Sequence, residues 1–206
     1  MPRAASQRQP RLSRDERTRQ TRENLLAAGS AVIGSEGYAS ASIARIADMA
    51  RVAHGTFYNY FDDRQALFDE LLPYEGARMI EAIEEAARDA APGLARELAR
   101  FRAFLDYVAR NPGFYRLLYE AEIFAPLAHR RHMDTIIAGY RRSFARAMAA
   151  GHAPALTPLA LDCLIHQLLG MRAYAAMQIV QSPDDAGDII EGATAIYERM
   201  LGQLLG

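Results

Sequence analysis

Lysine is absent from this chain of 206 residues, and all 24 of its basic residues are arginine. A phosphate-binding-loop lysine, a Schiff-base lysine and a lysine-dependent kinase site are therefore excluded. Tryptophan is also absent, and Cys163 is the only cysteine. A single cysteine excludes an intramolecular disulfide and any zinc site built from several cysteines. Because Cys163 lies among apolar residues, we expect a buried and unreactive thiol.

Long apolar runs are missing as well. The sequence has no uninterrupted apolar stretch of about 18 residues and no charged segment leading into the short apolar run of a secretory signal. We therefore expect a soluble, cytoplasmic protein with no membrane contact. Half of the residues are apolar, alanine is abundant, and no long alternating β-branched run occurs. These features favour an all-α fold over disorder or a sheet.

The net charge of −1 is distributed unevenly along the chain. Residues 1–64 hold ten arginines against seven acidic residues, giving +3, whereas residues 65–206 hold fourteen against eighteen, giving −4. Residues 1–22 alone hold seven arginines and two acidic residues, a net charge of +5. A basic end beside a nearly neutral body indicates a polyanionic partner for that end. Residues 1–12, with two prolines and three of these arginines, are expected to form a mobile basic arm.

Capping signals predict where the first helix lies. Ser13 and Glu16 have the spacing of a capping box, in which each side chain satisfies the other residue's backbone N–H. Gly34 and Gly37 are expected to end this helix near Ile33, and Gly37 suits a left-handed C-terminal stop.

Two short helices are predicted next. Residues 42–50 repeat apolar side chains at i, i+3 and i+4, and residues 54–60 form another short helix after a three-residue turn. This spacing is typical of a helix-turn-helix. Longer helices are predicted over residues 64–91, 94–110, 114–124, 126–150, 157–180 and 184–205, with Pro73 able to bend the first of them.

The segment 42–61 carries the strongest functional pattern. Phe57 and Phe61 are four residues apart, so they share one helix face and can pack with Val52 against the first helices. An aromatic corner of a helical bundle would show the same pairing, but it would not require the two flanking short helices.

The opposite side of this segment is small and polar. Gly55 allows the backbone to approach DNA closely, and a helix N-terminus there favours a phosphate. Thr56 can contact a thymine methyl or a base edge, and Asn59 can read adenine. The hydroxyls of Tyr58 and Tyr60 can donate to phosphates.

Residues 21–67 closely resemble the TetR family of bacterial regulators. The resemblance is carried by Leu25-Leu26 and Ala28, Glu36-Gly37-Tyr38, Ser42-Ile43, Ile46-Ala47, the run from Gly55 to Phe61, Arg64 and Leu67. It implies an all-α homodimer with a helix-turn-helix domain over 13–63 and a larger ligand-sensing and dimerisation domain over 64–206. It also implies double-stranded operator DNA as one partner and a small molecule as the effector. The DNA-binding residues implied are Ser42, His54, Gly55, Thr56, Tyr58, Asn59, Tyr60 and Arg64.

Four positions depart from the family pattern. Ala41 replaces a common threonine, so Ser42 must cap its helix alone, and Ala53 replaces the serine that caps the recognition helix. Losing that cap should cost about 1 kcal/mol. Arg51 replaces a turn glycine and is strained if its φ is positive. His54 replaces a lysine, which removes a phosphate-binding charge at neutral pH.

The last two predicted helices are strongly apolar. An internal core explains this pattern, but a protein that reads two half-sites about 34–36 Å apart also needs a two-fold interface. The resemblance implies that these helices pair with their copies in a four-helix interface. The residues predicted there are Leu168, Ile189, Ile196, Met200 and Leu204.

Aromatic and methionine side chains are frequent in the middle helices, where they can line an adaptable pocket or belong to an ordinary core. The ligand-binding residues predicted are Phe104, Tyr115, Tyr119, Met133, Tyr140, Met171 and Tyr174. An apolar or amphipathic ligand fits such a lining, and no cofactor is expected.

Metal binding is a weaker alternative. His129 and His132 are three residues apart and could bind a metal with a carboxylate from the preceding helix, Glu120 or Glu122. The adjacent arginines, 130 and 131, oppose a cation, so we predict no metal site. No protease, hydrolase, dinucleotide or P-loop signature occurs, which argues against an enzyme. A ligand- or metal-binding helical bundle that no longer reads DNA is the principal rival to a regulator.

Overall fold

A computed structural model describes residues 13–205, with side chains described through residue 203. Within that range the chain is helical and contains no strand, as predicted. The helices are α1 (Arg14–Glu36), α2 (Ile43–Met49), α3 (His54–Phe57), α4 (Arg64–Ala86), α5 (Leu94–Arg110), α6 (Pro112–Phe124), α7 (Pro126–Ala149), α8 (Pro158–Gln181) and α9 (Ala186–Leu205), with the 3-10 turn η1 (Pro183–Asp185) before α9. The predicted basic arm, residues 1–12, lies outside the described residues.

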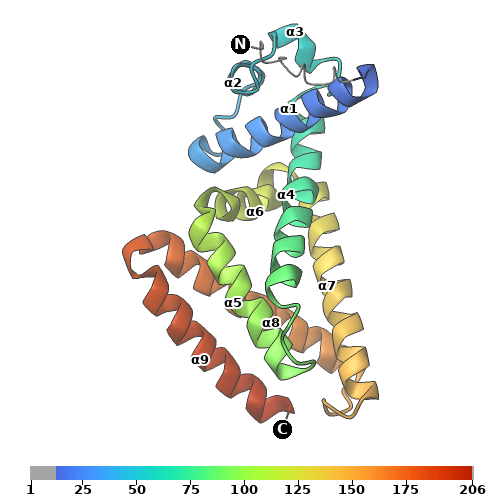
Figure 1. The fold of residues 1–206 in the computed structure, drawn as a ribbon, viewed down its shortest axis with the longest axis vertical. Coiled ribbons are helices and arrows are strands. Elements are labelled where there is room, and N and C mark those ends of the chain that lie inside the picture. The colour runs from blue at the N-terminus through green and yellow to red at the C-terminus, as the bar shows by residue number, and fades with distance from the viewer. Residues whose placement is uncertain (1–12, 206) are drawn as a thin grey trace, which may run out of the picture.

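The helices form a small N-terminal cluster on an elongated body (Figure 1). Helices α1, α2 and α3 pack together at one end, and α4 runs from this cluster into the body without interruption at Pro73. In the body, α4 packs against α5 and α7, and α5 packs against α8 and α9. Helix α4 contacts α1 as well as the helices of the body. The domain boundary predicted after residue 63 lies at the start of α4, so it separates the N-terminal cluster from a helix that packs against both parts.

Side-chain caps begin four of the helices, among them the predicted capping box. Ser13 and Glu16 form both hydrogen bonds of the capping box. The side-chain oxygens of Ser42, Asp63 and Thr157 each accept a backbone N–H of the following helix. These boundaries were predictable because a cap depends on residues only three positions apart.

Helix α1 is longer than predicted because Gly34 is a packing contact and does not stop the helix. A Cβ atom on Gly34 would lie 2.9 Å from the Cα of Gly113 in α6, so only glycine lets the two helices cross this closely. The helix ends at Gly37, whose φ is +82° and whose N–H donates to the Ile33 carbonyl at 2.8 Å.

Helix α4 is shorter than predicted and ends at Ala86. The chain between α4 and α5 is held by Arg96, whose guanidinium donates to the carbonyls of Ala90, at 2.8 Å, and Arg88. Gly93, with φ of +87°, then begins α5. The described helices include none that is both long enough and apolar enough to cross a lipid bilayer.

Candidate nucleic-acid interface and internal cavity

A buried aromatic pair fixes the position of α3. Phe57 is fully buried and Phe61 nearly so, with ring centroids 5.5 Å apart, as the i, i+4 spacing predicts. The guanidinium of Arg22 lies over the Phe61 ring at 5.1 Å and forms an ion pair with Glu70. Arg22 of α1, paired with Glu70 of α4, therefore covers the Phe61 ring, and the buried aromatic pair anchors this segment in the core.

The small and polar side of this segment faces solvent. Gly55, Tyr58 and Asn59 are exposed, and Thr56 and Tyr60 are half-buried. Helix α3 ends at Phe57, three residues earlier than predicted, so Asn59 and Tyr60 lie in a turn rather than on a helix face. The backbone N–H of Asn59 donates to the Thr56 carbonyl at 3.2 Å, which tightens this turn. His54 is exposed as well, and its ring centroid lies 5.7 Å from that of Tyr58.

Two predicted phosphate contacts also have structural roles. The Ser42 hydroxyl accepts the Arg45 N–H at 3.2 Å and therefore caps α2. Arg64 donates from Nη1 to the Ala41 carbonyl at 3.2 Å, and its guanidinium lies over the Phe68 ring at 5.3 Å. Both side chains remain exposed, so DNA contact by either would add to these internal contacts.

The departures at residues 51 and 53 have the expected structural consequences. Ala53 precedes α3 and offers no side-chain cap. Arg51 has a φ of +58° and is the only non-glycine residue with positive φ in the part of the chain that the structure describes. A left-handed conformation costs an L-residue about 1–2 kcal/mol, because Cβ approaches the following carbonyl.

Replacing Arg51 by glycine is therefore expected to stabilise the protein. The strain is removed, but glycine also gains freedom in the unfolded chain, so we expect a net gain of about 0.5–1 kcal/mol in the free energy of unfolding. Urea denaturation at fixed protein concentration measures it. Arg51→Ala is the matched control, because it removes the same charge and keeps Cβ. Equal stability of the two variants would contradict a strained Arg51.

Helix α6 connects the N-terminal cluster to the body. A carboxylate oxygen of Glu120 accepts the Tyr38 N–H at 2.9 Å, and Arg116 donates to the Ser35 carbonyl at 2.7 Å. Together with the glycine crossing described above, these contacts join the end of α1 to one side of α6.

A cavity of about 610 Å³ lies in the body, bordered by α4, α5, α6, α7 and α8. Its volume falls within the range of small-molecule sites, about 300–1,000 Å³. Four of the predicted ligand-binding residues line it: Phe104, Tyr119, Met133 and Tyr140. Tyr115, Met171 and Tyr174 lie outside its lining. Tyr174 is 69% exposed on the outer face of α8, because that apolar helix borders the cavity with only one of its sides.

The cavity wall holds a buried polar network that the sequence analysis missed. One carboxylate oxygen of Glu97, Oε1, accepts Arg172 at 2.8 Å, the Tyr197 hydroxyl at 2.8 Å and the Tyr140 hydroxyl at 3.1 Å. The Arg172 guanidinium lies over the rings of Phe104 and Tyr140 at 5.8 Å and 5.5 Å. Burial raises the pKa of both tyrosines, so they are neutral donors. Burial acts to lower the pKa of Arg172, but the facing oxygens more than compensate and raise it.

His132 separates this cavity from a second one of about 530 Å³ beside α1, α4 and α7. Its side chain is buried against Gly76, where an added Cβ would lie 2.4 Å from the imidazole Nδ1. Burial lowers the pKa of His132 to about 4, with His129 acting in the same direction. Among the described residues no group of three or more histidines, cysteines or carboxylates is placed to bind a metal.

The residues predicted for the dimer interface divide into three groups. Ile196 and Met200 are 60% and 40% exposed on α9, and Ile189 is half-buried beside them. Leu168 is fully buried in the chain's own core and cannot contribute, which corrects that prediction. The side chain of Leu204 lies outside the described residues. Cys163 is exposed, contrary to the expectation of a buried thiol, since the outer side of α8 is apolar as well as its inner side.

Comparison with known proteins shows which family the chain resembles. Residues 25–71 match the family model described as bacterial regulatory proteins of the tetR family. The fold matches a TetR-family regulator from Pectobacterium atrosepticum with a TM-score of 0.71 at 22% identity, over 94% of this chain and 98% of that one. A second match, from Syntrophomonas wolfei, has a TM-score of 0.74 at 19% identity, over 89% and 96% of the two chains. The chain is thus similar to the TetR family over residues 25–71, and it shares the fold of TetR-family regulators along most of its length. This family consists of transcriptional regulators and not of enzymes.

Two curated TetR-type relatives share sequence over part of their length. The transcriptional activator FasR of Mycolicibacterium smegmatis is 31% identical over 119 residues, which are 58% of this chain and 52% of FasR. The transcriptional repressor KstR of Mycobacterium tuberculosis is 29% identical over 136 residues, which are 66% of this chain and 62% of KstR. The matched segments thus span 52% and 62% of these relatives, less than two thirds of either.

Proposed function

We propose that this TetR-like chain is a transcriptional regulator, acting in the cytoplasm as a repressor, that binds a palindromic operator as a homodimer and is released by an apolar or amphipathic small molecule. The observation that carries the proposal is the surface formed by the exposed residues Gly55, Tyr58 and Asn59 and the half-buried Thr56, next to the buried pair Phe57 and Phe61. A rigid support with small, polar side chains facing outward suits direct reading of base edges. The relatives are named one an activator and the other a repressor, so the sign of regulation needs its own reporter assay.

Dimerisation is supported by apolar side chains left exposed on α8 and α9. Ile196 and Met200 on α9, and Leu159 and Tyr174 on α8, are 40–75% exposed. Large apolar side chains left exposed on two helices that pack together are suited to a protein–protein interface. A two-fold pairing of these helices would present two copies of α3 to two half-sites.

Ligand-controlled release is supported by the position of α6. Leu118, Tyr119 and Glu122 of this helix line the cavity, while Gly113 and Glu120 contact the end of α1. A ligand that prefers one position of α6 would therefore bias the position of the DNA-binding helices. It releases the operator only if it binds the non-reading arrangement more tightly.

Selection of bound DNA from a random pool tests the DNA-binding part of the proposal. We expect an enriched palindrome with half-sites about one helical turn apart. Thr56→Ala should alter the base preferred at one position of each half-site. Tyr58→Phe, which removes a phosphate donor, should weaken all sequences alike. A thermal melt of each variant checks that it folds.

The rival is a ligand-binding helical bundle that no longer reads DNA. It predicts no protected sequence even at low salt, where binding to phosphates is strongest. That outcome, with folded and dimeric protein, would contradict the proposed regulator.

A further inference from the structure

Two arginines at one end of the cavity retain unused hydrogen-bond donors. The Nε atoms of Arg100 and Arg172 are buried, and neither has a hydrogen-bond partner among the described residues. The Arg172 side chain is only 11% exposed, and that of Arg100 is 18% exposed. A buried N–H without a partner is unfavourable by about 1–3 kcal/mol, so it is a sign that a ligand or water completes the site.

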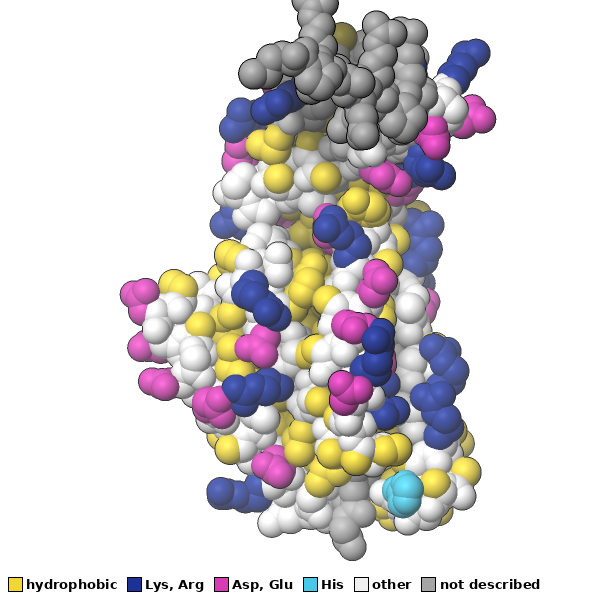
Figure 2. Space-filling model, in the orientation of Figure 1, with side chains coloured by type: hydrophobic (Ala, Val, Ile, Leu, Met, Phe, Trp, Pro, Cys, Tyr) yellow, Lys and Arg dark blue, Asp and Glu magenta, His cyan; other side chains and the backbone are white. Residues whose placement is uncertain are grey.

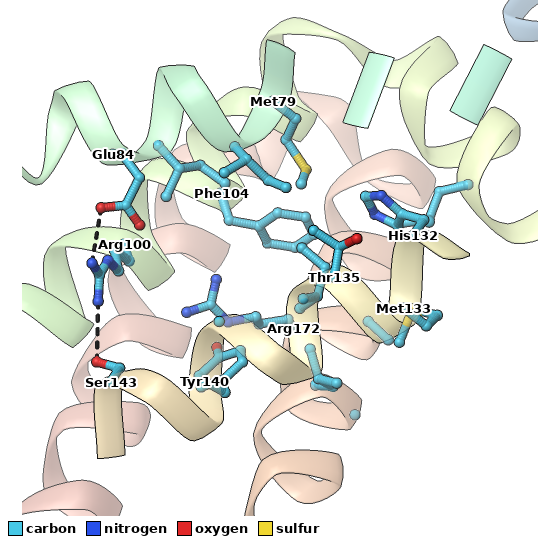
Figure 3. Close-up of a pocket in the computed structure, with 18 of the residues that line it drawn as sticks. Met79, Glu84, Arg100, Phe104, His132, Met133, Thr135, Tyr140, Ser143 and Arg172 are labelled. Atoms are coloured by element: carbon cyan, nitrogen blue, oxygen red, sulfur yellow. Dashed lines mark hydrogen bonds and ion pairs between the residues drawn. The ribbon is translucent and has the colours of Figure 1, made fainter. Parts of the chain in front are cut away.

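The remaining contacts of the two arginines hold them in place. Arg100 donates to Glu84 at 2.8 Å and to the Ser143 hydroxyl at 3.4 Å, and Arg172 donates to Glu97. Figure 3 shows Arg100, Glu84 and Ser143 together at one end of the cavity, with Arg172 between Phe104 and Tyr140 beside them. Each guanidinium has five N–H donors in a planar fork, and only one or two of these are used.

Charge in the cavity favours an anion. Its lining includes the arginines 100, 142, 146 and 172 and the glutamates 84, 97 and 122, which sum to +1. The most buried of these carboxylates, Glu97, is already satisfied by three donors on a single oxygen. Two of these arginines, 142 and 146, lie on α7, which carries three more, and Figure 2 shows basic side chains on the side of the body where α7 runs. A cation would meet four guanidinium groups, while two of the three carboxylates, Glu84 and Glu97, are already paired with Arg100 and Arg172.

The rest of the cavity is mostly apolar, with His132 and Thr135 among its polar residues. Met79, Ile80 and Ile83 of α4 face Leu118, Met133 and Leu169 of the other helices across it. Figure 3 places Met79 and Met133 at the end away from Arg100 and Glu84. Flexible methionines suit an apolar body of variable shape. One end of the cavity is therefore built for a negative group and the other for a hydrocarbon or ring.

We propose that the cavity binds an amphipathic carboxylic acid, whose carboxylate is received by Arg172 and Arg100 and whose apolar body lies along α4 toward Met79 and Met133. A carboxylate accepts two parallel N–H donors from the planar fork of arginine, which a neutral head group of similar bulk does not. The inference rests on the proposed ligand-sensing function and names the chemical class of that ligand. Arg172 and Arg100 are its specificity-determining residues.

Three probes of equal chain length and different head-group charge test the proposal. Calorimetric titration of the full-length protein, without DNA, compares decanoate, decanamide and decyltrimethylammonium. We expect decanoate to bind at least tenfold more tightly than the amide, and the cation to bind more weakly than both. The proposed carboxylate site would be overturned by any of three results: equal affinity for decanoate and decanamide, tightest binding of the cation, or no binding of any probe.

Variants assign the preference to the two arginines. Arg100→Gln should reduce the ratio of acid to amide affinity about tenfold, whereas Arg130→Gln, an exposed α7 position outside the cavity lining, should leave it unchanged. The paired variant Glu97→Gln with Arg172→Gln avoids an unpaired buried charge and should lower the ratio in the same way. An unchanged ratio in both cavity variants would contradict the assignment. Operator selection with ligand-free protein is a separate measurement, so loss of DNA binding and loss of acid binding are distinguished.

Discussion

Arg172→Met is expected to lower the free energy of unfolding by about 3–5 kcal/mol, the largest effect that we predict for a single substitution. The substitution leaves the Glu97 carboxylate buried at 13% exposure, with only two tyrosine hydroxyls to stabilise its charge. It also removes a guanidinium that lies over the Phe101, Phe104 and Tyr140 rings. Urea denaturation at neutral pH and fixed protein concentration measures the change, because the apparent stability of a dimer depends on concentration.

Two controls separate the buried pair from charge loss in general. The double variant Glu97→Gln with Arg172→Met should recover most of the loss, since no uncompensated charge remains. Arg88→Met breaks an exposed ion pair with Glu85 and should change stability by less than about 1 kcal/mol. Two outcomes would contradict the idea that Arg172 compensates for the burial of the Glu97 charge. One is a fall of less than about 1 kcal/mol in the free energy of unfolding of Arg172→Met, and the other is a double variant as unstable as the single one.

This network also marks the limit of what the sequence could predict. Glu97 and Arg172 are 75 residues apart, and nothing local to either indicates the other. In the sequence, Arg172 is one of two charged residues in a mostly apolar helix, the other being Asp162. A position facing solvent is the usual expectation for such a residue. The structure buries it, because α5 and α9 supply Glu97, Phe101 and Tyr197 on the same side.

The helix-turn-helix was predictable for the opposite reason. Ser42 caps the helix that starts at the next residue, and Phe57 and Phe61 are neighbours on one turn. Each of these relations spans three or four residues and is visible in the sequence. The end of α3 was placed too late, because the turn after Phe57 depends on how the aromatic pair packs against α1 and α4.

Helix α8 shows why the interface residues were harder to assign. It is apolar over most of its circumference, so periodicity does not tell its inner face from its outer one. Leu168 was assigned outward and is buried, and Cys163 was assigned inward and is exposed. Only the packing of α5 and α9 against α8 determines which side faces the core.

Acidification is expected to destabilise the protein through His132. The folded-state pKa of this residue is lowered to about 4 from an ordinary value of 6.5, so the folded protein binds fewer protons than the unfolded chain between these values. Its neutral form is therefore fully compatible with folding above pH 6.5, and stability is lost as the pH falls toward 4. The loss should reach roughly 2–3 kcal/mol at pH 4, because one unit of pKa corresponds to about 1.4 kcal/mol.

The cause lies in the position of His132 between the two cavities. The imidazole of His132 lies so close to Gly76 that a Cβ added to residue 76 would clash with the ring. None of the described charged groups that line the two cavities is hydrogen-bonded to this imidazole. Of these, Arg131 donates to the Asp69 carbonyl, and Glu70 is paired with Arg22. A proton on His132 would therefore be buried without a counter-charge in contact, a state that the chain avoids by unfolding or by opening α7 away from α4.

Comparison of variants across pH isolates this contribution from the carboxylates that also titrate. His132→Gln removes the titrating group, so its free energy of unfolding should fall less than that of the unaltered protein between pH 6.5 and 4, by roughly 2–3 kcal/mol. His152→Gln, at an exposed position, should follow the unaltered protein. Parallel pH profiles for His132→Gln and the unaltered protein would mean that His132 gains its proton without cost, and that α7 already leaves room for water beside it.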